Sequence, residues 1–169
     1  MSADLQRTTG GAYLRHEIEA GPDWIVHTGL RMERSRLEAD GTSGGLTIFD
    51  DAKTHNGWAW DLGVTWAFFP GSKLFWRANR VYQYPMLDEQ VSYYGYGTDG
   101  LYADLEAERG FQIESGLDAR MMDSLRAGLT VFLLEMKEEV AWDPVAWRNA
   151  NLDQTRREGV ETWGEWKWT

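Results

Sequence analysis

Large apolar residues alternate with small or polar ones between positions 58 and 68 of the chain. Successive side chains of a β-strand point to opposite faces, so this stretch predicts a strand with one apolar and one polar face. Its length matches the roughly 9–11 residues that a tilted strand needs to cross a bilayer. Asp61 and Thr65 belong to the polar face. The apolar face, which we predict to be directed toward lipid, consists of Trp58, Trp60, Leu62, Val64, Trp66 and Phe68.

The same alternation recurs, with varying clarity, along the rest of the chain. No stretch has a convincing helical period, because the one candidate, 101–108, is bracketed too closely by Gly100 and Gly110. The sequence therefore predicts an all-β chain, an antiparallel meander of about seven to eight strands in which sequence neighbours pair. The predicted strands are 12–20, 24–39, 56–69, 73–84, 107–119, 123–141 and 150–168, of which the first has the weakest pattern.

The connections between these strands are alternately short and long. Tight turns are predicted near 21–23, 70–72 and 120–123, and long loops rich in Gly, Asp, Asn and Tyr at 40–54, 85–107 and 142–150. Outer-membrane barrels have short turns toward the periplasm and long loops outside. A soluble β-sandwich also has half-buried, alternating strands, but it has no reason to separate its loops by length. The pattern thus favours a transmembrane β-barrel, or a section of one.

Composition restricts the classes of function. The formal net charge of -10 and the pI near 4.7 argue against a nucleic-acid partner, because no basic stripe is present to neutralise phosphates. The absence of cysteine excludes thiol catalysis and thiolate metal sites. Ten Trp and seven Tyr are typical of a protein whose amphipathic rings sit at a water–lipid boundary. The first residues lack the apolar core of a secretory signal.

Several segments resemble the barrel domain of TonB-dependent outer-membrane receptors. Segment 24–34 is similar to a Gly-x-Arg-x-Glu strand of that family, and segment 105–117 to its entry into a following strand, with Ala107 where Pro is usual. Segment 151–161 is the closest match. The other matching segments are 75–80, leading into 84–89, and 129–132, followed by 138–140. The resemblance runs from about residue 12 to the end of the chain.

The resemblance implies a location in the bacterial outer membrane and a family role in the uptake of ferric siderophores or similar nutrients. The implied partners are outer-membrane lipid, a small-molecule or metal-chelate ligand, and the remainder of a barrel or further copies of the chain. Neither a plug domain nor a TonB-contact segment can be recognised. We therefore expect residues 1–169 to be a single, partial barrel domain that does not transport a ligand by itself.

The search for chemistry is mostly negative. Residues 95–100 match the glycine pattern of a dinucleotide site, but the required helix does not follow. His16, His27 and His55 have no metal-ligand spacing. We therefore predict no catalytic residue, no metal site, no cofactor and no enzymatic activity. Aromatic loops are good contact surfaces, and the one candidate ligand-contact loop carries Tyr93, Tyr94, Tyr96, Asp99 and Tyr102.

Two alternatives to a receptor-barrel section stay open on the sequence alone. The chain can be a small independent outer-membrane barrel with a structural or adhesive role. It can also be a soluble β-sandwich binding module, in which the rings of residues 58–68 form the core. An outer-membrane enzyme would need a nucleophile and base near the barrel mouth, and none can be assembled from these residues.

Overall fold

A computed structural model describes residues 2–43, 45–90, 105–146 and 148–168 of the chain. These residues form one antiparallel sheet of seven strands, paired in sequence order. Within the described residues, the single helix η1 (Asp88–Gln90) has three residues, and no helix is long and apolar enough to cross a membrane. The strands are β1 (Ser2–Glu19), β2 (Trp24–Ser43), β3 (Leu46–Phe69), β4 (Ser72–Gln83), β5 (Glu108–Met122), β6 (Leu125–Asp143) and β7 (Arg148–Trp166).

The structure confirms the predicted all-β meander of antiparallel neighbours. The described strands make a single sheet, whereas a sandwich requires two that pack face to face. Three predicted boundaries are wrong. The first strand begins at Ser2 instead of residue 12. The loops predicted at 40–54 and 142–150 are mostly strand, because β2 and β3 continue almost to a tight turn at Gly45, and β6 and β7 continue to Asp143 and Arg148.

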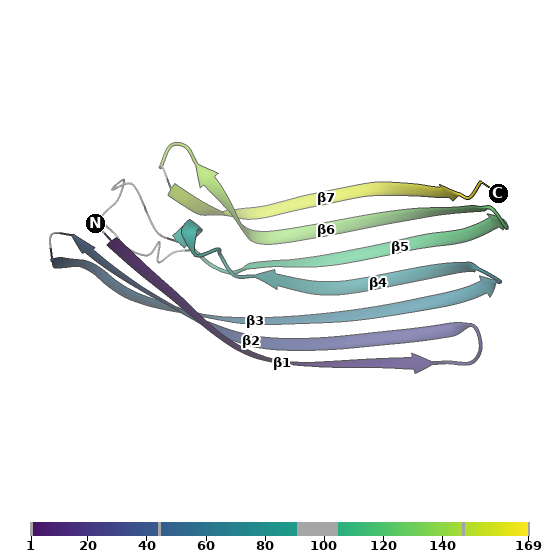
Figure 1. Ribbon diagram of the computed structural model, residues 1–169, viewed down its shortest axis with the longest axis horizontal. Helices are drawn as coiled ribbons and strands as arrows, with labels where there is room; N and C mark the ends of the chain where they lie inside the picture. Colours follow the sequence, from purple (N-terminus) through teal and green to yellow (C-terminus); the bar gives the residue numbers. More distant parts are fainter. Residues whose placement is uncertain (1, 44, 91–104, 147, 169) are drawn as a thin grey trace.

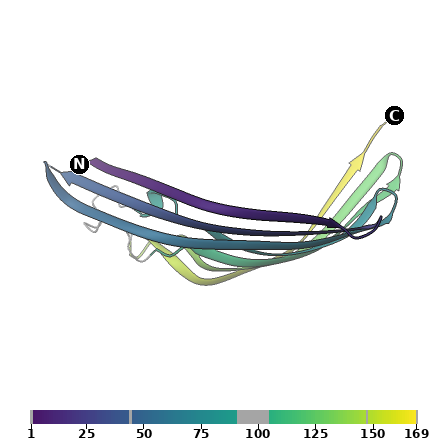
Figure 2. The same ribbon diagram turned by 90° about the horizontal axis from the view of Figure 1, so that it is seen from below.

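The sheet is bowed along the length of its strands, so that it forms an open trough (Figure 2). The turns that follow β1, β3 and β5 all lie at one end, which we call the turn end (Figure 1). The β2–β3 hairpin, the β4–β5 connection with η1 and the β6–β7 turn lie at the opposite end, which we call the loop end. The two ends of the sheet therefore differ in character, and β4, with 12 residues, is the shortest strand between them.

Glycine permits the tight turns at the turn end. Gly21 and Gly71 have φ values of 83° and 78°, which residues with a Cβ rarely adopt. Pro70 precedes Gly71, and the pair Phe69–Ser72 closes the hairpin immediately around them. The residue after β7 contacts the third turn, because the Lys167 N–H donates to the Ser124 carbonyl at 2.9 Å. Short turns of this kind leave no room for a crossover, and the strands must pair in order.

The strand register gathers large apolar residues from all seven strands on one face of the sheet. In the pairs Trp24–Trp66, Val26–Val64 and Leu30–Trp60, both side chains belong to the face predicted from residues 58–68. The face is open to its surroundings, since Leu62 is 45% exposed and Val160 is 65% exposed. The register adds Leu14 and Ile18 from β1, Trp76 and Ala78 from β4, Phe111 and Ile113 from β5, and Leu129, Val131 and Leu133 from β6.

The opposite face is polar and carries cross-strand ion pairs. Arg77 contacts Glu114 at 3.0 Å, and Lys73 contacts Asp118 at 3.3 Å. Glycines on this face leave space for large side chains of the neighbouring strand: a Cβ added at Gly116 would lie 2.3 Å from Cζ of Phe75. The same arrangement places His27 across Gly63, Phe132 across Gly159 and Trp163 across Gly128.

Candidate functional site

The β4–β5 connection folds onto the polar face of the sheet at the loop end. Its two described parts, residues 84–90 and 105–107, are what we call the loop anchor. Arg7 of β1 donates a hydrogen bond to the Pro85 carbonyl. Lys53 of β3 donates to the Leu105 carbonyl at 2.6 Å, and Asn149 of β7 donates to the Glu89 carbonyl at 3.1 Å. The connection is therefore held by strands from both halves of the sheet.

A small buried cluster lies beneath the loop anchor. Leu37 and Ala39 of β2 are each only 1% exposed, and Leu87 of the anchor packs against them. Leu105, from the other part of the anchor, is also buried. These residues lie on the same face as Glu33 and Arg31, so the anchor covers the polar face, not the apolar one. Apolar side chains thus point inward here because the loop shields them from water.

An aromatic row leads from β4 into the loop anchor. The rings of Tyr82 and Tyr84 have centroids 5.3 Å apart, and those of Tyr84 and His55 are 5.7 Å apart. The Tyr84 hydroxyl donates to the Glu33 carbonyl at 3.1 Å. Tyr82 fits because Gly57 lacks a side chain, since a Cβ there would lie 2.3 Å from its ring. The row fixes the direction in which the connection leaves β4.

His55 is the buried titratable group of this site, with only 5% of its surface exposed. Burial lowers its pKa below the ordinary value of 6.5, and the neighbouring positive charge of Lys53 acts in the same direction. Four buried polar atoms of this site make no hydrogen bond to the described residues: Nε2 of His55, Oε1 of Gln90, Nε of Arg7 and the hydroxyl oxygen of Tyr82. The arrangement accepts a neutral imidazole and disfavours a charged one.

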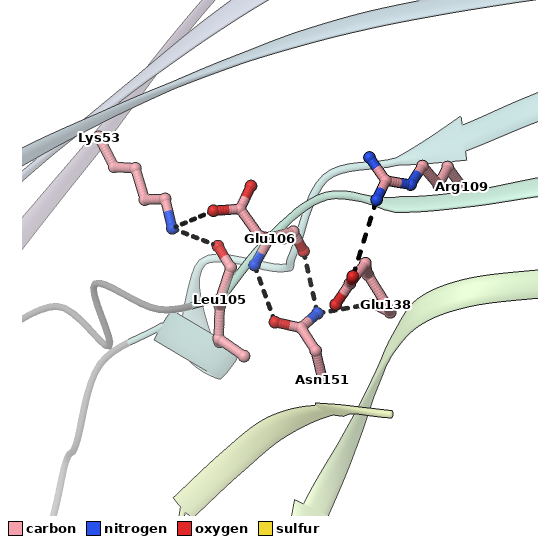
Figure 3. A network of polar contacts seen from close by, with 6 residues as sticks. All are labelled: Lys53, Leu105, Glu106, Arg109, Glu138 and Asn151. Atoms are coloured by element: carbon pink, nitrogen blue, oxygen red, sulfur yellow. Dashed lines mark hydrogen bonds and ion pairs between the residues drawn. The ribbon is translucent and has the colours of Figure 1, made fainter. Parts of the chain in front are cut away.

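The second part of the loop anchor is held by Asn151 of β7 (Figure 3). Its Oδ1 accepts a hydrogen bond from the Glu106 N–H at 2.8 Å, and its Nδ2 donates to the Glu106 carbonyl at 3.1 Å. The same Nδ2 donates to the carbonyl of Glu138 at 2.6 Å. Glu138 has a φ of 59°, and no other non-glycine residue of the described ranges has a positive φ. Asn151 therefore ties the loop to a distorted point of β6.

Lys53 completes the network from the other side. Its Nζ lies 3.5 Å from Oε1 of Glu106, in addition to its bond with the Leu105 carbonyl. Leu105 and Glu106 therefore connect β3 with β7, which lie four strands apart in the sheet. This arrangement can position a loop over the polar face. Across the described part of the chain, no group of three or more His, Asp or Glu is placed to hold a metal ion.

The structure describes one of the two predicted sets of site residues and not the other. Tyr93, Tyr94, Tyr96, Asp99 and Tyr102 lie outside the described residues, and their role as a ligand-contact loop stays a prediction. Trp58, Trp60, Leu62, Val64 and Trp66 share one face of β3, as their register with β2 and β4 shows. Their exposure to lipid stays a prediction as well. Trp66 stacks on Trp24 at 5.4 Å and contacts Phe68 at 5.7 Å, which concentrates three rings near the turn end.

The loop anchor itself was not predicted from the sequence. Lys53 and Asn151 are separated from Glu106 by 53 and 45 residues, so their meeting depends on the finished sheet. One local signal was present in the segment 35–39. Its small or apolar residues Ser35, Leu37 and Ala39 stand on the polar face, whereas Arg36 and Glu38 stand on the opposite face. An apolar patch on a face that is otherwise polar indicates a covering segment.

The whole chain, residues 1–169, matches the family model described as TonB dependent receptor-like, beta-barrel. No curated protein is similar enough in sequence to match it. Among solved structures, the ferric-catecholate import receptor Fiu from K12 E. coli is similar to 99% of the chain, with a TM-score of 0.75 and 19% identity. The siderophore receptor PiuA from Acinetobacter baumannii is similar over 99%, with a TM-score of 0.76 and 17% identity.

The copper transporter OprC is similar over 98% of the chain, with a TM-score of 0.78 and 15% identity. The chain spans 26% of Fiu, 24% of PiuA and 27% of OprC, which is about a quarter of each. At such identities the likeness shows a shared fold. That fold is a section of the wall of a much larger barrel.

Proposed function

Because the chain belongs to the family of TonB-dependent receptor-like β-barrels, whose members lie in the bacterial outer membrane, we propose that it forms a wall section of a receptor for metal chelates such as ferric siderophores. In this proposal the apolar face meets lipid and the polar face lines the lumen. The loop end is outside the cell, since short turns in such barrels face the periplasm. The role is binding and passage, without catalysis.

The observation that carries the proposal is the separation of the two faces over a length that fits a membrane. Trp58 and Phe68 mark the ends of the apolar face on β3. The ten steps between them span about 33 Å along the strand, or about 25 Å of bilayer thickness at a tilt of about 40°. That thickness equals the apolar band of outer-membrane barrels. Ion pairs such as Arg77–Glu114 suit the aqueous side.

The loop anchor supports a receptor role for the β4–β5 connection. Lys53 and Asn151 hold its base over the proposed lumen, where a ligand entering from outside would meet it. In the sequence, the predicted ligand-contact loop lies between the two parts of the loop anchor and carries Tyr93, Tyr94, Tyr96, Asp99 and Tyr102. The ligand class is proposed from the relatives, which are named as ferric-catecholate, siderophore and copper proteins.

We also propose that the 169 residues alone do not transport a ligand. Even eight closed strands enclose only enough space for side chains or one small ligand. Seven strands therefore leave no passage for a metal chelate. An open sheet would also expose unpaired strand edges that lipid cannot satisfy, which favours self-association or pairing with the remainder of a barrel.

Refolding into detergent tests this proposal. The chain is run unheated on a gel and titrated with a ferric catecholate, using tryptophan fluorescence as the readout. We expect oligomers or aggregates and no saturable response. A compact, heat-modifiable monomer that binds the ferric catecholate would instead identify a complete small barrel, and the proposal of a wall section would be abandoned.

A further inference from the structure

The part of the β6–β7 hairpin at the loop end is attached to the sheet less firmly than the rest. Pairing between β5 and β6 ends at Lys137, and β7 is the last strand of the described sheet. Beyond Lys137, β6 pairs with β7 alone. Figure 1 shows this part of the hairpin turning away from β5. We call its described residues, 139–146 and 148–152, the strap. A ribbon of two strands is marginally stable by itself, so the strap needs other contacts.

Glu138 joins the strap to the sheet in an unusual backbone conformation. Its φ is 59°, and the β6–β7 register passes from Lys137–Gln154 to Glu139–Leu152 without pairing it. The left-handed region is unfavourable for a residue with a Cβ, and such a conformation persists only where the surrounding contacts hold it. Glu138 is therefore a point at which the chain would change direction if those contacts were lost.

One side chain connects Glu138 with the loop anchor (Figure 3). Nδ2 of Asn151 donates to the Glu138 carbonyl at 2.6 Å, and the same amide group contacts Glu106 through its Oδ1 at 2.8 Å and its Nδ2 at 3.1 Å. The Glu138 carboxylate adds an ion pair with Arg109 at 3.7 Å. The backbone conformation of Glu138 and the position of Glu106 thus depend on the same amide.

Two more polar contacts join the strap to the β4–β5 side of the sheet. Nδ2 of Asn149 donates to the Glu89 carbonyl of the loop anchor at 3.1 Å. The Val140 N–H donates to Oε1 of Glu108, the first residue of β5, at 2.8 Å, so a carboxylate accepts this bond in place of a neighbouring strand. Each such hydrogen bond contributes little net stability, because water can replace it. These contacts therefore hold the strap in a position from which it can be released.

We propose that the strap is a movable element, held against the loop anchor by Asn149 and Asn151, that turns about Glu138. While the loop anchor lies on the sheet, Asn151 keeps Glu138 in the left-handed conformation. When the anchor leaves the sheet, Glu138 returns to an extended φ and the strap moves away. Displacement of the β4–β5 connection is thereby transmitted to the β6–β7 end of the protein. This inference goes beyond the proposed function and does not require the apolar face to meet lipid.

Distances between two spin labels test the proposal. The chain has no cysteine, so nitroxides can be attached selectively after the substitutions Gly10→Cys on β1 and Val145→Cys in the strap. Nothing lies within 4 Å of a Cβ added at Gly10, and Val145 is 88% exposed. The full chain is refolded into detergent and diluted with unlabelled chain, and double electron–electron resonance gives the distance distribution. A second distance, absent from the main population, reports the released strap.

The first comparison removes the contacts that hold the strap. We expect Asn149→Ala/Asn151→Ala to increase the released fraction about fivefold or more, since several hydrogen bonds are lost at once. Asn56→Ala removes an amide from β3, outside these contacts, and should leave the distribution unchanged. An unchanged distribution in the double variant would overturn the proposal.

The second comparison concerns the backbone of Glu138. Glu138→Val and Glu138→Asn both remove the carboxylate that contacts Arg109, but asparagine tolerates a positive φ and a β-branched valine does not. We expect the released fraction to be about fivefold larger in Glu138→Val than in Glu138→Asn. Equal fractions would show that Glu138 is not the hinge. If Glu138→Val does not fold, Glu138→Gln and Glu138→Asn carry the same comparison, because both side chains are uncharged amides and asparagine adopts a positive φ more readily.

The third comparison tests transmission from the loop anchor. Lys53 contacts Leu105 and Glu106 from β3, on the far side of the anchor from the strap. We expect Lys53→Ala to increase the released fraction about fivefold, although Lys53 lies outside the strap. Lys73→Ala removes another lysine from the polar face and should have no effect. Equal distributions in Lys53→Ala and Lys73→Ala would contradict the coupling between the loop anchor and the strap.

Discussion

Asn151 contacts Glu106 through two hydrogen bonds at once, accepting from its N–H and donating to its carbonyl. An amide side chain thereby provides the pairing that a neighbouring strand would otherwise provide. Glu106 lies in the second part of the loop anchor, and Asn151 lies in β7. The contact fixes the base of the β4–β5 connection without extending the sheet.

Removing this side chain should release the base of the loop. We expect Asn151→Ala to weaken the protection of the Glu106 amide by about 1–3 kcal/mol, because a typical hydrogen bond contributes about 0.5–1.5 kcal/mol. Hydrogen exchange of the Glu106 amide is the measurement. Asn56→Ala removes an exposed amide from the other face and should leave that amide unchanged. Equal protection in Asn151→Ala and the unmodified chain would contradict the role of Asn151 in holding the base of the loop.

The buried His55 should make the loop anchor sensitive to acid. Its pKa is lowered in the folded chain, so above its ordinary value of 6.5 the ring is neutral in both states and pH has no effect. As the pH falls below that value, the released ring binds a proton that the buried ring does not. The anchor therefore loses stability progressively as the pH falls from about 6.5 through the folded pKa.

Limited proteolysis between about pH 7.5 and about pH 5 measures this effect. Cleavage within residues 84–90 should increase on acidification in the unmodified chain. His55→Gln removes the titrating ring and should flatten the pH dependence, whatever its effect on basal stability. A steep dependence that persists in His55→Gln would assign the acid response to another group.

Glycines that pack against a large side chain on the polar face should not tolerate substitution by alanine. In Gly116→Ala the new Cβ would lie 2.3 Å from Phe75 Cζ and 2.9 Å from the Leu129 carbonyl oxygen. We expect a loss of about 1–3 kcal/mol in the free energy of unfolding, the usual cost of overpacking. Gly10→Ala is the matched control, because nothing lies within 4 Å of its added Cβ. Urea unfolding compares the two, and equal midpoints would contradict the close contact.

A charged side chain should be tolerated on the polar face of β3 and should disfavour membrane insertion on the apolar face. Val64 and Thr65 are adjacent, near the middle of the proposed membrane span, and point to opposite faces. We expect Val64→Arg to make membrane insertion less favourable by about 2–4 kcal/mol. Thr65→Arg should make it less favourable by a much smaller amount. Refolding into vesicles at increasing urea concentrations measures both. Equal penalties would contradict the assignment of the two faces.

The sequence predicted the strands within the apolar band because alternation is a local property. Between Trp58 and Phe68 every second residue is large and apolar, and this contrast exists before any contact is made. In β1 the contrast is weaker, because His16 interrupts the apolar side and Tyr13 stands on the polar side. The register nevertheless places Ile18 opposite Val26, on the apolar face.

Beyond the apolar band the same reasoning fails. In β2 the contrast reverses, since Leu37 and Ala39 point toward the loop anchor while Arg36 and Glu38 are exposed on the other face. Both strands of the hairpin continue here, but without the alternation of a membrane-spanning strand. For that reason the sequence predicts a loop at 40–54 where the structure has strand. The loop anchor depends on residues far apart in sequence, such as Lys53 and Glu106, which only the assembled sheet brings together.

The central claim is that the apolar face meets lipid and the polar face does not. Single-tryptophan variants that retain Trp60, Trp66 or Trp163 test it most directly, in vesicles whose acyl chains carry bromine. Trp60 and Trp66 belong to the apolar face, and Trp163 lies across Gly128 on the polar face. We predict strong quenching of Trp60 and Trp66 and little quenching of Trp163. Quenching of Trp163 with Trp60 and Trp66 unaffected would contradict the account.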